Sequence, residues 1–469
     1  MPPCVLCLLI CFIHDRSNGG PDIPLAVVPV HQLVLDHLRK HDPEGICMVP
    51  WKTYTFRQFL CHTISSANYL HHIGLRKETV VALVLPNCPE FATCLLAIFA
   101  DGGIATCLSP AFTTGKLQQS FDDPRFSFQF KFLKLCFLFK EIITVDPCDF
   151  GAYGDSIRLS EMDFDFGGEQ LLASVSFDCK KDLCICPLSS GTTLHPKAVK
   201  LSHYNVASMI QSIRLFRAEK ITLPVKGFNI ICFLPFYHIY GTVIFLVGLL
   251  RGFVMITMEE FKSELFLNLI QTYKVMCQFL FVVPPILNFL VRHPLVKKFD
   301  ISSVKTILVA AAPFGKEESG YLAYGLTEIS GASHIMPAVP VSKLRHGSCG
   351  VLLPNFECKV RELSGKTRNA MERGEICLRG PACCLGYFGN EGATEQLIDS
   401  EGWLHTGDVG YFDEDGYYFI VDRIKDMIKI KGFQVFNISL RNELLHMKHI
   451  ADAKQFLPDF TAFIPRSDR

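Results

Sequence analysis

The stretch from Ser189 to Val199 reads SSGTTLHPKAV and combines hydroxyl side chains, a glycine and one lysine in an otherwise apolar chain. It follows the apolar run Leu183–Leu188, which predicts a strand, and it precedes Tyr204–Phe216, which predicts a helix. Backbone N–H groups and hydroxyls in such a turn can bind an anion, and a lysine adds positive charge. The loop therefore predicts a phosphate site. An ordinary solvated loop has a similar composition, and the GxxxxGKS/T spacing of the Walker loop is absent.

Three later motifs carry further groups with possible chemistry. They are LPFYHIYG with His238, YGLTE with Glu328, and the long stretch GWLHTGDVGYFDEDGYYFIVDRIKDMIKIKGFQV with Asp408. Read singly, each group has a structural explanation. The histidine can be a buried core residue, the glutamate a helix-terminal carboxylate and the aspartate a turn cap. The lysines at the end of the last motif can form a solvated face.

The elements that must position these groups alternate between strand and helix. Val80–Leu85 predicts a buried strand, Phe91–Phe99 a helix and Ile104–Leu108 the next strand, which is an α/β pattern. Similar alternation continues to the strand predicted at Thr306–Ala311. After Gly347, short strands separated by Gly and Asp turns predict a β-rich unit. The expected fold class is thus α/β, with two α/β subdomains followed by a β-rich subdomain.

Composition limits the partners of the chain. Lys+Arg and Asp+Glu both number 46 in 469 residues, so no nucleic-acid partner is indicated. The 20 cysteines lie mostly in apolar runs, which favours buried free thiols over a disulfide framework. Pro235, His238 and Arg251 interrupt the apolar region at 228–258, so no membrane span is expected there. Residues 1–21 are set aside as an N-terminal extension of uncertain role.

In this order, the motifs resemble the adenylate-forming superfamily of acyl-CoA synthetases. Within it, the chain is similar to the branch of 4-coumarate–CoA ligases and beetle-type luciferases. The segments ALVLPNCPEF (82–91) and SPAFTTGKLQ (109–118) also match that branch. The resemblance runs from about Asp22 to about Ala453. It implies an AMP-binding (adenylation) domain at residues 22–424 and a truncated small C-terminal lid domain at residues 425–469.

The resemblance assigns roles in nucleotide binding. The ATP phosphates are expected against the loop residues Ser189, Ser190, Gly191, Thr192, Thr193 and Lys197. The remaining nucleotide-binding positions are expected at Tyr324, Gly325, Thr327, Asp408, Arg423, Lys431 and Gly432. Tyr324 would stack near the adenine, Thr327 would contact the α-phosphate, and Asp408 with Arg423 would reach the ribose.

The resemblance also implies a catalytic set and the cofactors. The catalytic residues are expected to be Lys197, His238, Thr327, Glu328 and Lys429. Glu328 would be the ligand of Mg2+, and His238 would lie where the acid meets the α-phosphate. Lys425 would lie at a hinge, and the segment 429–432 would approach coenzyme A in the second half-reaction.

The implied reaction has two steps. A carboxylate attacks the α-phosphate of ATP and gives an acyl-adenylate and pyrophosphate. The thiol of coenzyme A then attacks the activated acyl carbon and releases AMP. The partners are thus a small carboxylic acid, ATP and coenzyme A, with positioning and charge stabilisation as the protein's contribution. The acid itself, aromatic or fatty, stays open.

Four departures from the family pattern leave alternatives open. Residues 126–139 are richer in Phe and less family-like than their flanks. Leu194 and Ala198 replace two glycines of the phosphate loop, where a side chain is costly if the glycine had a positive φ. The segment between Ala311 and Tyr324 is short, and loss of a helix and strand there is expected to open or rearrange the sheet. The chain also ends soon after HIADA (449–453), before the expected C-terminal lysine.

Three functions are therefore considered. The first is an ATP-dependent carboxylate–CoA ligase, the second an impaired homologue that binds nucleotide or acyl ligand, and the third a luciferase-like adenylating monooxygenase. A cytoplasmic or peroxisomal location is expected. The terminal residues Ser467, Asp468 and Arg469 do not match a peroxisomal signal.

Overall fold

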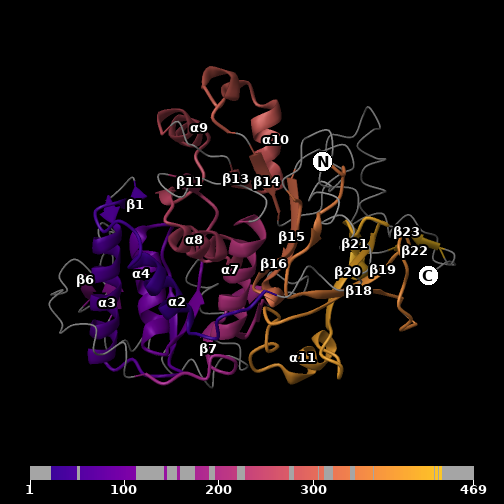
Figure 1. The fold of residues 1–469 in the computed structure, drawn as a ribbon, viewed down its shortest axis with the longest axis horizontal. Helices are drawn as coiled ribbons and strands as arrows, with labels where there is room; N and C mark the ends of the chain where they lie inside the picture. Colours follow the sequence, from indigo (N-terminus) through magenta and orange to yellow (C-terminus); the bar gives the residue numbers. More distant parts are fainter. Residues whose placement is uncertain are drawn as a thin grey trace, which may run out of the picture.

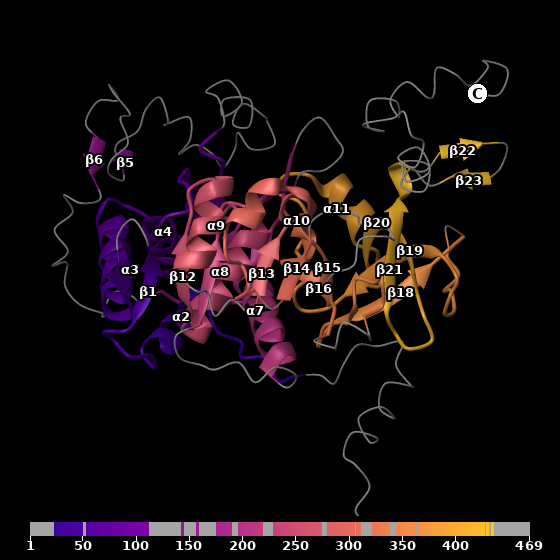
Figure 2. The same ribbon diagram turned by 90° about the horizontal axis from the view of Figure 1, so that it is seen from above.

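The computed structural model of the chain has alternating helices and strands that build several separate sheets (Figure 1). Seen from above, the indigo N-terminal elements lie at one end and the orange and yellow strands at the other (Figure 2). The predicted α/β class is confirmed. The structure describes residues 23–49, 53–111, 142–144, 156–158, 175–189, 196–218, 228–273, 279–304, 306–310, 321–337, 344–362, 364–426, 428–430 and 433–435.

The first sheet has the strand order β10–β7–β4–β3. Its strands are β3 (Val80–Leu83), β4 (Ile104–Cys107), β7 (Leu183–Ile185) and β10 (Leu201–Ser202). The helix α4 (Pro89–Ala100) connects the parallel strands β3 and β4, and α3 (Phe56–His72) packs beside it. Thr55 and Gln58 form a capping box that satisfies N-terminal backbone donors of α3.

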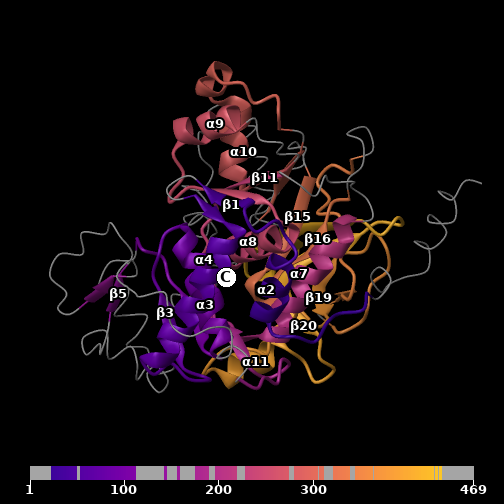
Figure 3. The ribbon, with the colours of Figure 1, turned by 60° about the vertical axis from the view of Figure 1, so that its left-hand side comes forward.

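The second sheet, β11–β12–β1–β2, carries the helix that later lines the site. Its strands are β1 (Ile46–Val49), β2 (Tyr54–Thr55), β11 (Asn229–Cys232) and β12 (Val254–Thr257). The helix α8 (Ile239–Arg251) connects the parallel strands β11 and β12 and packs against α2 (Val30–Leu38) and α7 (His203–Ala218) (Figure 3). None of the described helices combines the length and apolar character that crossing a membrane requires.

The third sheet, β13–β14–β15–β16–β17, corrects one expectation. Its strands are β13 (Phe279–Val282), β14 (Thr306–Val309), β15 (Tyr321–Leu326), β16 (Gly331–Ile335) and β17 (Val351–Leu352). Strand β15 pairs directly with β14 in parallel. Of the two expected consequences of the short segment before Tyr324, an opened or a rearranged sheet, the described strands do not show an opened one, because β15 itself continues the sheet from β14 to β16.

Two helices and a 3-10 turn complete this part of the chain. The helix α9 (Ser263–Thr272) follows β12, and α10 (Pro284–Arg292) with the turn η4 (Pro294–Lys298) connects β13 to β14. Two prolines begin α10, where the missing N–H groups cost no intrahelical hydrogen bond.

The fourth sheet confirms the predicted β-rich unit. Its antiparallel strands, in order, are β18 (Glu357–Arg361), β19 (Gly374–Arg379), β20 (Leu404–Phe412) and β21 (Tyr418–Arg423). The strands β20 and β21 form an antiparallel hairpin, and α11 (Glu391–Leu397) lies between β19 and β20 in the chain. After the turn η7 (Ile424–Asp426), β22 (Ile428–Ile430) and β23 (Phe433–Val435) form a separate two-stranded sheet.

A buried aromatic cluster fixes the loop before α8. Phe91, Phe236 and Phe245 pack with ring centroids 4.9–6.2 Å apart. Asn87, 1% exposed, donates to the carbonyls of Cys232 and Leu234 and accepts from the N–H of Phe236 at 2.7 Å. Because a buried amide is costly unless it is hydrogen-bonded, these contacts hold the loop in one conformation.

The described cysteines agree with the sequence interpretation. All 14 are free, and most are buried. Burial raises the pKa of thiols such as Cys186 to about 12, so they stay protonated at neutral pH. The strand β5 (Ile142–Thr144) pairs with β6 (Ser156–Arg158). The segment FSFQFKF (126–132), in which Phe alternates with polar residues in the pattern typical of a strand, lies outside the described residues.

Candidate active site

The ends of the predicted phosphate loop are held by a short pair of strands. β8 (Leu188–Ser189) pairs with β9 (Lys197–Ala198) in antiparallel fashion, with Ser189 opposite Lys197. Ala198 lies in this strand and has no positive φ, so no conformational cost arises from replacing a glycine there. The loop positions Ser190, Gly191, Thr192, Thr193 and Leu194 lie outside the described residues.

A second segment pairs with this stem and brings Tyr387 beside Lys197. The N–H of Phe388 donates to the carbonyl of Ala198 at 2.8 Å, and Val199 forms a β-bridge with Tyr387. The Nζ atom of Lys197 lies 4.6 Å from the centroid of the Tyr387 ring, within the range of a cation–π contact.

Tyr387 also contacts Glu328. Its hydroxyl donates to Oε1 of Glu328 at 2.8 Å. Burial and the neighbouring carboxylate raise the pKa of Tyr387, so the phenol keeps its proton and stays a donor. Lys197, Tyr387 and Glu328 thus form a continuous group, although they lie far apart in the sequence.

A tight turn between β15 and β16 positions Glu328. The 3-10 turn η5 (Thr327–Ile329) ends at Ser330, which has a left-handed conformation with φ +60° and is fully buried. The backbones of β15 and β16 approach so closely that a Cβ at Gly325 would lie 1.9 Å from the carbonyl oxygen of Gly331. The geometry therefore requires glycine at 325 in the YGLTE motif.

The predicted ribose pair lies on neighbouring strands. Asp408 on β20 is opposite Arg423 on β21, and Oδ1 of Asp408 lies 3.3 Å from Nε of Arg423. The hydroxyl of Tyr324 donates to Oδ2 of Asp408 at 2.6 Å. Burial raises the pKa of Asp408, and the hydrogen bond from Tyr324 and the charge of Arg423 oppose this shift. The structure thus brings together all three predicted residues.

His238 caps the N-terminus of α8. Its Nδ1 accepts a hydrogen bond from the N–H of Tyr240 at 3.2 Å. Burial lowers the pKa of His238, so the ring is neutral at physiological pH. A neutral imidazole whose Nδ1 accepts must carry its proton on Nε2, so Nε2 is a donor.

One cavity of about 520 Å³ connects these groups. This volume is in the usual range for small-ligand sites. The predicted residues that line it are Ser189, Lys197, His238, Tyr324, Gly325, Thr327, Glu328 and Arg423. Lys425 also lines it, and Asp408 bonds to two lining residues. Apolar residues of α8, β13 and β16 line the rest, which gives the cavity a polar region and an apolar region.

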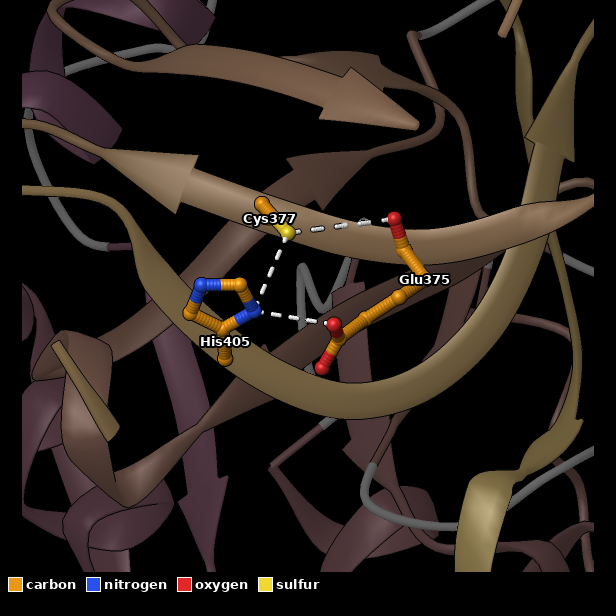
Figure 4. A group of neighbouring side chains, drawn as sticks. All are labelled: Glu375, Cys377 and His405. Carbon is orange, nitrogen blue, oxygen red and sulfur yellow. Dashed lines mark hydrogen bonds and ion pairs between the residues drawn. The ribbon is translucent and has the colours of Figure 1, made fainter. Parts of the chain in front are cut away.

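Beside the polar region, Glu375, Cys377 and His405 form a cluster whose types could hold a metal (Figure 4). Nδ1 of His405 lies 2.9 Å from Glu375 Oε2 and 3.6 Å from Cys377 Sγ, and its Nε2 lies 3.3 Å from Asp399 Oδ2. The carboxylate of Glu375 also accepts from the N–H of Gly407 at 3.1 Å. Because both ring nitrogens already face carboxylates, the cluster acts as a polar network that fixes β20 just before Asp408.

The sequence did not single out Glu375, Tyr387 or His405 as site residues. His405 lies within the motif that begins GWLHTGD, whereas no local pattern marks the other two. Of the predicted residues near the C-terminus, Lys429 lies in β22, and Lys431 and Gly432 lie outside the described residues.

Solved structures of other enzymes share this architecture. A long-chain-fatty-acid–CoA ligase from Archaeoglobus fulgidus superposes with a TM-score of 0.73 over 92% of this chain and 89% of that one, at 21% identity. A luciferase-like enzyme from the mealworm Zophobas morio superposes with a TM-score of 0.72 over 88% of this chain and 100% of that one, at 23% identity. The fold is that of the adenylate-forming enzymes.

Sequence comparison then gives the family. Residues 35–388 match the model of the AMP-binding enzyme family. A probable 4-coumarate–CoA ligase from Dictyostelium discoideum is 34% identical over 93% of this chain and 84% of its own length. A 4-coumarate–CoA ligase from Nicotiana tabacum is 32% identical over 91% of this chain and 81% of its own length. The chain therefore belongs to the AMP-binding enzyme family, among its 4-coumarate–CoA ligase-like members. The family and fold predictions are confirmed, and the role of each residue stays a prediction.

Proposed function

We propose that the chain is an ATP-dependent carboxylate–CoA ligase. The observation that carries the proposal is the cavity, because it joins Lys197, Glu328 and the Tyr324–Asp408–Arg423 group to an apolar region through His238. Its relatives above 30% identity are named as ligases of this kind, which supports the same reaction. In this proposal residues 22–424 form the adenylating domain, and the lid domain begins at Lys425.

The first step joins the acid to AMP. An oxygen of the substrate carboxylate attacks the α-phosphorus of ATP, and the bond to the β-phosphate oxygen breaks. Lys197 and the loop donors neutralise the negative charge of the leaving pyrophosphate. Tyr324, Asp408 and Arg423 hold the nucleoside, and the Nε2–H of His238 donates to the acyl carboxylate. Positioning and charge complementarity supply the rate.

Glu328 fits the role of a Mg2+ ligand. One oxygen, Oε1, accepts from Tyr387, and the other has no partner among the described residues. Mg2+ binds through one or two carboxylates together with phosphate oxygens, so one available oxygen suits it. When bound, the ion would neutralise phosphate charge; Glu328 would hold it, and Tyr387 would orient Glu328.

The second step transfers the acyl group. The thiol sulfur of coenzyme A attacks the acyl carbon of the adenylate, the bond to the phosphate oxygen breaks, and AMP leaves. We assign the segment 429–432 to the approach of coenzyme A, with Lys425 as the hinge. This assignment rests on the resemblance of the motif.

A luciferase-like oxygenase is the second candidate. The shared fold with the mealworm luciferase-like enzyme motivates it. Both enzymes would form the same adenylate, so the two differ only in what attacks it. Light emission or oxygen uptake, dependent on ATP and acid, would identify the oxygenase. An impaired homologue would instead bind nucleotide without releasing pyrophosphate.

The first test is ATP–pyrophosphate exchange with Mg2+ and a panel of aryl and fatty acids. We expect acid-dependent exchange that falls by about 10²- to 10³-fold in Lys197→Ala and Glu328→Ala, since each removes charge stabilisation. Lys366→Ala and Glu414→Gln change exposed side chains of the same types and should leave the rate unchanged. Folded wild-type protein without exchange for any acid would contradict the proposal.

A further inference from the structure

The apolar region of the cavity follows one face of α8. Tyr240, Val243, Ile244, Val247 and Arg251 all line it, at spacings of three and four residues that place them on one side of the helix. The helix has 13 residues and so spans about 20 Å. His238 caps its first turn and Arg251 ends its last turn, so the cavity has the histidine at one end and a guanidinium at the other.

Arg251 lies among apolar side chains. Apolar residues such as Ile213, Phe228, Val247 and Phe253 line the same cavity. Its Nη2 donates to the backbone carbonyl of Arg214. Within the described part of the chain, no carboxylate lies within ion-pairing distance of Arg251, and burial together with the charge of Arg214 lowers its pKa. A partly buried cation of this kind is costly unless an anion accompanies it.

The neighbouring Arg214 also has no carboxylate partner among the described residues. Its Nη1 lies 2.8 Å from Nε2 of His37, whose Nδ1 is 2.8 Å from the carbonyl of Leu33. Burial lowers the pKa of His37, so this histidine is neutral and accepts from the guanidinium. The Nε of Arg214 is buried and has no hydrogen-bond partner among the residues that the structure describes. Two guanidiniums therefore lie together without an anion from the described residues.

The C-terminus of α8 explains why a basic residue stands at position 251. It does not explain why the side chain of that residue lines the cavity. Cations are favoured at helix C-termini, and Gly252 with φ +69° ends the helix just after Arg251. That interaction is satisfied equally well by a side chain in solvent. The partly buried guanidinium in the wall of an acid-binding cavity calls for a separate explanation.

We propose that Arg251 binds a second anionic group at the far end of the substrate, so that the preferred acids are elongated dicarboxylic acids. One carboxylate would lie at His238 and react with ATP, and the other would pair with Arg251. The apolar side chains between them suit a hydrocarbon or aromatic spacer. This inference rests on the proposed function and adds the substrate class to it.

The test compares acids that differ only at the far end. Exchange is measured with straight-chain monocarboxylic acids and with α,ω-dicarboxylic acids of equal length. We expect the wild-type kcat/KM to favour a dicarboxylic acid of matching length by about 10- to 100-fold, the usual effect of a charge-assisted hydrogen bond. Arg251→Gln should remove this preference and leave kcat/KM for monocarboxylic acids within about threefold, whereas Arg251→Lys should retain part of it. The control Arg292→Gln, an exposed arginine of α10, should change neither.

The outcomes separate the two proposals. If monocarboxylic acids are preferred throughout the series, or Arg251→Gln lowers kcat/KM for both series equally, the dicarboxylate inference is wrong and the ligase proposal stands. If no acid supports exchange, the ligase proposal fails. In that case, calorimetric titration of the same acids with AMP present still tests Arg251, since equal Kd values for the two series would overturn the inference. The wild-type comparison needs no variant, so a misfolded Arg251→Gln leaves it intact.

Discussion

At the scale of single residues, Tyr387 joins the two charged groups expected to hold ATP and Mg2+. Its ring lies under Lys197, and its hydroxyl donates to Glu328. Neither contact involves a residue near Tyr387 in the sequence. In the proposed reaction Tyr387 would therefore be a positioning residue, because its hydroxyl hydrogen-bonds to the carboxylate of Glu328.

Tyr387→Phe should raise the Mg2+ concentration needed for half-maximal exchange by about 3- to 10-fold, since it removes one hydrogen bond to Glu328. The measurement is the exchange rate against Mg2+ concentration at saturating ATP. Tyr411→Phe, on β20, serves as the control. An unchanged Mg2+ requirement in Tyr387→Phe would show that Glu328 is oriented by other contacts.

At the scale of elements, the close approach of β15 and β16 fixes the YGLTE turn. A side chain at 325 would overlap the backbone of Gly331, and Ser330 keeps a left-handed conformation while its hydroxyl donates to the carbonyl of Ala382 at 2.8 Å. These contacts attach the turn to the segment that leads to Tyr387. The position of Glu328 therefore depends on the register of two strands.

Gly325→Ala should lower the free energy of unfolding by about 3 kcal/mol or more and abolish exchange, because the strands must separate to admit a Cβ. Gly392→Ala is the matched control, since nothing lies within 4 Å of its Cβ position in α11. Alanine there should stabilise the helix by up to about 1 kcal/mol. Denaturant unfolding of both variants checks the prediction, and equal stabilities would contradict it.

At the scale of the whole molecule, buried histidines set the response to acid. Burial lowers the pKa of His31, His203 and His334 to about 3. Since the unfolded chain has histidine pKa values near 6.5, it binds more protons than the folded chain between pH 6.5 and 3. Each residue therefore stabilises the fold above pH 6.5, and this stability is lost as the pH falls toward 3.

The free energy of unfolding should fall by about 1.4 kcal/mol per pH unit for each of these histidines below pH 6.5. Burial raises the pKa of Asp101 and Asp408, and these groups act in the opposite direction. His31→Met should reduce the slope of the free energy of unfolding against pH by the equivalent of about one bound proton. The change His346→Asn at an exposed histidine should leave this slope unchanged. Urea unfolding at several pH values between 5 and 8 measures the slope. If the free energy of unfolding has the same pH dependence in His31→Met and in wild type, His31 does not contribute to the acid response.

The sequence by itself determined the α/β class, the β-rich unit and the order of the motifs. Hydrophobic patterning marks β3, α4 and β4, because a buried face imposes its period locally. Motif spacing marks Lys197, His238, Glu328 and Asp408 as candidates in the same way. Local patterns suffice for these features because each is set within a few turns or one strand.

Only the tertiary structure decided which of these groups meet. The contact of Tyr387 with Glu328 spans 59 positions, and that of Tyr324 with Asp408 spans 84. The pairing of β14 with β15, and the place of Arg251 in the cavity wall, likewise depend on register and helix packing. Such contacts leave no local pattern, because they are fixed by the packing of distant segments, where side chains must fill space and satisfy buried polar groups.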